Sequence, residues 1–164
     1  MIAIIRILYL LLSFFHWYIV AFECEDGWEL FEMGCYRISE DVKNYAEAEN
    51  DCIQKGGHLT SVHSKEEDTF LRRLTGPPDS PNHVPIVIIG GKAEADQDQV
   101  YTFYWTDGSS FDFFDNWAPD QPHLSGAQDC IGMMPGPDSS EGAWFIDICD
   151  STHKYICKKP LEGN

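Results

Sequence analysis

The apolar positions in the first third of the chain recur at helical spacing. Three of them share one face of a predicted helix: Tyr45, Ala48 and Cys52. Asn44 precedes this face and Glu47 follows three residues later, which is the pattern of a capping box at a helix start. The pair at 56–57 is Gly-Gly, which ends the helix.

A second helix is predicted to begin at Ser64, a serine cap with Glu67 three residues further on. Its buried stripe consists of Phe70, Leu71 and Leu74. The sequence Gly-Pro-Pro that starts at Gly76 ends it, because proline cannot continue a helix.

The remaining segments predict strands and loops. Residues 28–38 indicate two short strands with a turn, 86–89 a buried strand, and 155–157 a terminal strand. Residues 77–85 and 92–99 are polar and are predicted to be loops. After residue 100 the aromatic residues show no helical period, which predicts long loops anchored by large side chains. Early helices followed by strands and loops indicate an α+β domain.

Residues 1–21 have the layout of a secretory signal peptide. Arg6 is followed by an apolar run from Ile7 to Val20 that closes on the small residue Ala21, so the mature chain is predicted to begin near Phe22. An uncleaved signal anchor is the competing interpretation, since the run approaches the length of a membrane span. His16 interrupts the run, and the absence of a spacer before Cys24 also favours cleavage. The protein is therefore expected to be secreted, with no stable membrane insertion after cleavage.

The formal charge of −16 becomes −17 when the leader is removed, because Arg6 leaves and no acid does. This charge repels phosphate backbones, so nucleic acid and anionic membrane surfaces are excluded as partners. All six cysteines follow the leader and none forms a C-x-x-C pair, which predicts three disulfides in an oxidising compartment. Spacing alone leaves about 15 connectivities open.

Candidate chemistry is sparse. No H-E-x-x-H pattern or paired Cys/His spacing surrounds the histidines at 58, 63, 83, 123 and 153, so no catalytic residue is predicted and the protein is expected not to be an enzyme. Glu94, Asp96 and Asp98 either place oxygens on a cation or form a solvated acidic loop. Phe111 and the pair 113–114 either pack in the core or contact a ligand.

Several motifs together resemble the C-type lectin family. They run from Cys24 to Lys158 and include Gly57-His58-Leu59-Thr60-Ser61, Ile88-Ile89-Gly90-Gly91, Trp105-Thr106-Asp107-Gly108, Asn116-Trp117-Ala118-Pro119 and Tyr155-Ile156-Cys157. The resemblance implies a C-type-lectin-like fold over residues 24–158, with two helices, antiparallel strands, a long irregular loop region and a short tail at 159–164. It also implies three disulfides: Cys24–Cys35, Cys52–Cys157 and Cys130–Cys149.

Sugar binding in this family usually runs through a calcium ion held by carboxylate and amide oxygens. By resemblance, the Glu-Pro-Asn or Gln-Pro-Asp triplet stands here as Gln121-Pro122-His123, and Gln128 replaces a glutamate. The Asn-Asp pair of the family is replaced by the residues at 145–146, Phe-Ile, which carry no side-chain oxygen. We therefore expect no metal and no cofactor, and we assign Gln121, His123 and Gln128 as candidate ligand-binding residues.

Two functions follow from these observations. The first is a secreted carbohydrate-binding module that works without the usual calcium, by hydrogen bonds and aromatic stacking, and for which the resemblance suggests a role in host defence or innate immunity. The second is a calcium-independent protein-recognition module with no sugar binding. Changes at Gln121, His123 and Gln128 discriminate between a glycan and a protein ligand.

Overall fold

The computed structural model describes residues 23–76, 86–96, 98, 100–111, 116–124, 129–136 and 143–161. The predicted signal peptide at 1–21, the loop at 77–85 with His83, the pair 113–114 and Gln128 lie outside the described residues.

Two helices form where the apolar periodicity and caps predict them. Helix α2 covers Tyr45–Gln54, and its Asn44 cap exchanges hydrogen bonds with Glu47 as a capping box. Helix α3 covers Lys65–Leu74, and the Ser64 side chain accepts a hydrogen bond from the Glu67 backbone N–H. Neither helix in the part of the chain that the structure describes is long and apolar enough to cross a membrane.

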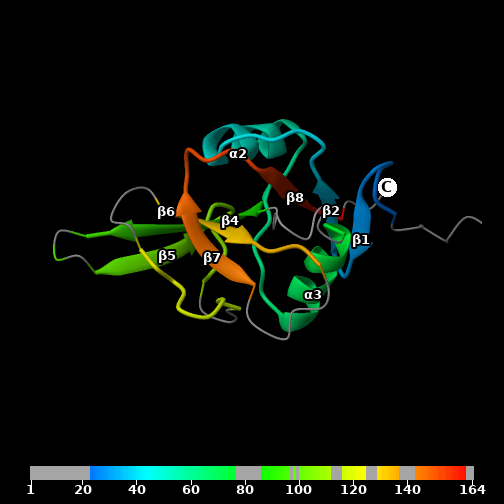
Figure 1. Ribbon diagram of the computed structural model, residues 1–164. Helices are drawn as coiled ribbons and strands as arrows, with labels where there is room; N and C mark the ends of the chain where they lie inside the picture. The colour runs from blue at the N-terminus through cyan, green and yellow to red at the C-terminus, as the bar shows by residue number, and fades with distance from the viewer. Residues whose placement is uncertain are drawn as a thin grey trace, which may run out of the picture.

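Eight strands form one mixed sheet: β1 (Glu29–Phe31), β2 (Gly34–Ile38), β3 (His58–Leu59), β4 (Val87–Ala95), β5 (Tyr101–Trp105), β6 (Asp129–Met133), β7 (Trp144–Ile148) and β8 (Lys154–Pro160). The order across the sheet is β1-β2-β8-β4-β6-β7, with β3 paired to β8 and β5 paired to β4. The β1–β2 hairpin and strand β7 therefore lie at opposite ends of this order (Figure 1).

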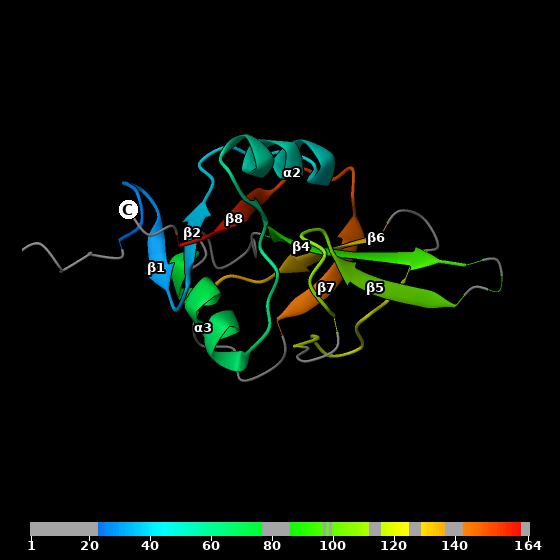
Figure 2. The same ribbon diagram turned by 180° about the vertical axis from the view of Figure 1, so that it is seen from behind.

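The two helices lie on opposite sides of the central strands (Figures 1 and 2). Successive side chains of a strand point to opposite faces of a sheet. Val87 and Ile89 of β4 accordingly join the cluster with Phe70 of α3. Ile88 between them joins the cluster with Tyr45 of α2. The predicted buried faces of both helices are confirmed in this way, and the α+β class is confirmed with them.

Four details differ from the sequence-based expectations. Strand β4 continues to Ala95 through a segment that we predicted as loop, because Ala93 is buried and pairs with strands on both sides. Residues 101–105, 129–133 and 144–148 form strands instead of anchored loops, since β5 and β6 pair with β4 and β7 pairs with β6. Strand β8 extends to Pro160 beyond the predicted domain end at 158. One strand pair, β4 with β8, is parallel, so the sheet is mixed and not purely antiparallel.

The cysteines form the three disulfides that the resemblance implies: Cys24–Cys35, Cys52–Cys157 and Cys130–Cys149. The second joins α2 to β8 across 105 residues of sequence. The third joins the start of β6 to the turn after β7 and so fixes the base of the irregular loops.

Candidate functional site

The Gln121 loop lies beside β7, where Trp117 forms an isolated bridge with Trp144. The Gln121 side-chain oxygen, Oε1, accepts hydrogen bonds from the backbone N–H groups of Ile146 at 3.0 Å and His123 at 3.1 Å. An amide carbonyl oxygen has two lone pairs, so these two donors occupy both of them. Gln121 thus joins the loop to β7 through Oε1, the atom that a cation would need as a ligand.

Among the described residues, the other side chains near this loop either carry no oxygen or have partners of their own. Ile146 and Phe145 are half-buried in β7, and the His123 side chain is exposed. The Asp147 carboxylate contacts the His153 Nε2 atom at 2.7 Å and accepts a hydrogen bond from the Ile148 N–H at 2.8 Å. Asp129 is fully buried. Within the ranges that the structure describes, no group of three His, Cys, Asp or Glu residues is placed to hold a metal.

Of the three acidic residues singled out from the sequence, Glu94 lies within β4, and Asp96 and Asp98 lie in the turn that follows it. Asp96 Oδ1 accepts hydrogen bonds from the N–H groups of Asp98 at 2.9 Å and Val100 at 2.8 Å. Glu94 accepts a 2.6 Å hydrogen bond from the Tyr104 hydroxyl, and partial burial together with this bond raises the pKa of Tyr104 to about 12. The carboxylates of Glu94 and Asp96 therefore each have a local structural partner.

Phe111 is half-buried and packs against the hydrophobic core. Its ring lies 4.7 Å from that of Trp105 and 5.5 Å from that of Phe103, measured between ring centroids. The packing interpretation is therefore confirmed for Phe111.

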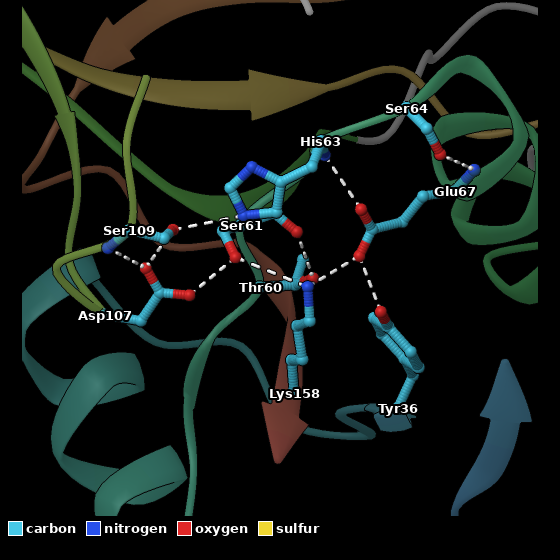
Figure 3. A network of polar contacts seen from close by, with 9 residues as sticks. All are labelled: Tyr36, Thr60, Ser61, His63, Ser64, Glu67, Asp107, Ser109 and Lys158. Carbon is cyan, nitrogen blue, oxygen red and sulfur yellow. Dashed lines mark hydrogen bonds and ion pairs between the residues drawn. The ribbon is translucent and has the colours of Figure 1, made fainter. Parts of the chain in front are cut away.

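A second polar region, the Glu67–Lys158 network, was not identified from the sequence. Seven side chains join it: Tyr36, Ser61, His63, Glu67, Asp107, Ser109 and Lys158 (Figure 3). They come from β2, the segment between β3 and α3, α3 itself, the loop after β5, and β8. Pairs such as Glu67 and Lys158 are 91 residues apart in sequence, so spacing gives no signal for them.

At the centre of this network the Lys158 ammonium lies 2.7 Å from Glu67 Oε1 and 3.4 Å from the Ser61 hydroxyl. Glu67 is only 5% exposed, and its carboxylate also accepts hydrogen bonds from the Tyr36 hydroxyl at 2.5 Å and the His63 N–H at 2.8 Å. Burial and the Glu67 carboxylate raise the pKa of Tyr36 well above its ordinary range, so its hydroxyl stays a proton donor.

Asp107 organises the other half of the network. Burial would raise the pKa of Asp107, but hydrogen bonds from Ser109 and Ser61 outweigh burial and hold it below its ordinary value. The Ser109 hydroxyl donates to Asp107 Oδ1 at 2.5 Å and lies 3.1 Å from His63 Nε2. Ser109 thus links the Asp107 carboxylate to the His63 ring within the network.

A groove of about 1010 Å³ opens over this network. The β1–β2 hairpin forms one wall, and the turn after α2, the start of α3, the loop at Asp107 and the end of β8 form the others. Phe31, Met33 and Tyr36 supply apolar surface, while Glu67 and Lys158 supply charge.

The two helices, the mixed sheet and the three disulfides define a C-type-lectin-like domain. The family model described as "Lectin C-type domain" matches residues 41–159. The chain belongs to the C-type lectin family.

Similar proteins cover most of the chain. A snaclec subunit from Philodryas olfersii is 33% identical, and the match covers 82% of this chain and 79% of the relative. CEL-IV is 32% identical to this chain, and its crystal structure matches with a TM-score of 0.72. The match covers 87% of this chain and 97% of CEL-IV. A calcium-independent type II antifreeze protein is 28% identical with a TM-score of 0.67 and covers 85% and 96%. The chain spans 9% of one receptor that it matches and 45% of another.

Proposed function

We propose that this protein is an extracellular carbohydrate-binding domain that recognises its ligand without the calcium ion used by many members of the family. The observation that carries the proposal is the engagement of Gln121 Oε1 by two backbone N–H groups, because it leaves that oxygen no lone pair for a cation. A calcium-independent type II antifreeze protein with the same fold supports the compatibility of this architecture with a calcium-free function.

The types of side chain in the loop, judged as calcium ligands, support the same proposal. Calcium prefers six to eight oxygens and needs compensation by carboxylates. Phe145 and Ile146 stand where the family has two oxygen ligands, and His123 offers an imidazole, which calcium accepts poorly. A sugar must then be held by direct hydrogen bonds from side chains and by apolar contacts with the faces of its rings.

Glycan-array binding in the presence of EDTA tests the proposal. We expect the mature protein to retain a defined set of glycans, with the same signal in calcium and in EDTA. Binding that EDTA abolishes would refute calcium independence. Failure to retain any glycan, together with saturable binding of a protein ligand, would support the protein-recognition alternative instead.

We also propose that the protein is extracellular and that it acts in host defence. The predicted leader and the three disulfides support export through an oxidising compartment. N-terminal sequencing of protein collected from the medium should give a start between Phe22 and Cys24. Retention of the chain in the membrane fraction would indicate an uncleaved anchor.

A further inference from the structure

We infer that the groove over the Glu67–Lys158 network is the saccharide-binding site of this domain. The inference rests on the proposed function for the chemical class of the ligand, but it assigns a different location from the Gln121 loop. The groove volume of about 1010 Å³ is at the upper end of the range of about 300–1,000 Å³ that is typical of small-molecule sites.

The polar groups in the groove retain hydrogen-bonding capacity. An ammonium has three N–H donors, and those of Lys158 are directed at Glu67 and Ser61 within the described part of the chain, which leaves one for a ligand oxygen. Glu67 Oε2 accepts from the His63 N–H and keeps a second lone pair. A sugar hydroxyl both donates and accepts, so it can satisfy a donor and an acceptor placed this close together.

The charges in the groove favour a neutral ligand over an anionic one. Lys158 is neutralised by Glu67, and the neighbouring Lys159 pairs with Glu25 at 2.9 Å. Glu32 and Asp107 add negative charge to the lining. A phosphate, sulfate or carboxylate would therefore meet no uncompensated cation among the described residues of the lining, whereas a neutral polyhydroxylated ligand meets no electrostatic penalty.

The β1–β2 hairpin provides the apolar wall that a pyranose face requires. Met33 is 70% exposed at the turn, Phe31 is half-buried, and Tyr36 also lines the groove but is only 2% exposed. The Tyr36 ring also lies 5.5 Å from the Lys158 ammonium, so the apolar wall and the polar floor are contiguous. Apolar contacts with Met33 and Phe31 and hydrogen bonds with the polar floor can thus act on one sugar ring at the same time.

Two glycines allow side chains to be introduced at the groove without a steric clash. Gly56 and Gly108 line it at φ angles of +83° and +78°, and a Cβ at either position would meet nothing within 4 Å. Asparagine is the side chain that best tolerates this left-handed conformation. Gly76 has a φ of +69° and the same open surroundings but does not line the groove, which makes Gly76→Asn the matched control.

The experiment measures glycan affinity for four variants. We expect the double variant Gly56→Asn/Gly108→Asn to bind at least about tenfold more weakly, which is about 1.4 kcal/mol, and Gly76→Asn to bind as the wild type does. Met33→Asp, a change at an exposed position, should also weaken binding because it removes part of the apolar wall. The competing site is tested by His123→Ala/Gln128→Ala, which lowers glycan affinity only if the ligand is held by the Gln121 loop.

The outcomes separate the two proposals. If the wild type binds glycans and only the His123→Ala/Gln128→Ala variant loses them, the groove is not the site and calcium-independent sugar binding stands. If the groove variants and Met33→Asp all bind like the wild type, the inference is likewise overturned. If the wild type binds no glycan at all, both the proposed function and this inference fail.

Discussion

Lys158 is predicted to stabilise the domain mainly through the buried carboxylate of Glu67. In Lys158→Met the side chain keeps most of its length, but Glu67 loses its ammonium partner at 2.7 Å while remaining only 5% exposed. Removing one partner of a fully buried ion pair costs about 3–5 kcal/mol. The Lys158 side chain is 24% exposed, so water partly replaces it, and we expect the free energy of unfolding to fall by about 2–3 kcal/mol.

Urea unfolding with the disulfides intact measures this loss. Lys159→Met is the matched control, since Lys159 is the next residue of the same strand but pairs with Glu25, whose side chain is 76% exposed. We expect a loss below about 1 kcal/mol there: the Lys159 side chain is only 15% exposed, but its partner Glu25 stays solvated when the ammonium is removed. Adding Glu67→Gln to Lys158→Met should recover part of the loss, because the uncompensated charge is gone. Equal losses for Lys158→Met and Lys159→Met would refute the reasoning.

Three further predictions concern stability. Asp68→Ala should lower the free energy of unfolding by about 2–3 kcal/mol, because it removes the Asp68 Oδ1 atom that accepts a 2.8 Å hydrogen bond from Trp144 Nε1–H. Asp68→Asn should cost less, and equal losses for the two variants in urea unfolding would contradict this. Removing the Cys52–Cys157 disulfide by a double alanine substitution should cost about 4–5 kcal/mol by loop entropy, and a loss under about 1 kcal/mol in thermal unfolding would count against it. Burial of Asp51 is outweighed by hydrogen bonds that lower its pKa from 3.8 to about 2, so its contribution to the free energy of unfolding is full above pH 3.8 and is lost as the pH falls through 2. Asp51→Asn should therefore lower stability at neutral pH and match the wild type below pH 2. A stability difference that stays constant across this pH range would oppose the assignment.

The helices and disulfides could be predicted from the sequence because their signals are local or are carried by the family resemblance. The capping box at Asn44 lies within four residues, and the predicted face of α2 is buried against the sheet. Strand β5 could not be predicted in the same way, because its aromatic residues gain their regular structure only by pairing with β4. Strand formation in such a segment depends on pairing with the neighbouring strand more than on the segment's own sequence.

Some features of the candidate site could likewise be predicted from the sequence, and others could not. The missing calcium ligands at 145–146 are visible in the sequence by comparison with the family pattern. The engagement of Gln121 Oε1 by the Ile146 N–H is not visible there, since a backbone donor leaves no trace in residue identity. The Glu67–Lys158 network was missed because its members converge from five separate elements.

Calcium-dependent thermal unfolding most directly tests whether the Gln121 loop has lost its ion. A ligand that binds the folded state stabilises it by RT ln(1 + [L]/Kd), so with a Kd of about 10 mM or weaker, about 10 mM calcium adds at most about 0.4 kcal/mol. For a domain of this size that raises the Tm by less than about 2 °C relative to EDTA. A rise of about 8 °C or more would correspond to a site about a hundred times tighter and would contradict our assignment of Gln121 Oε1 to the loop backbone.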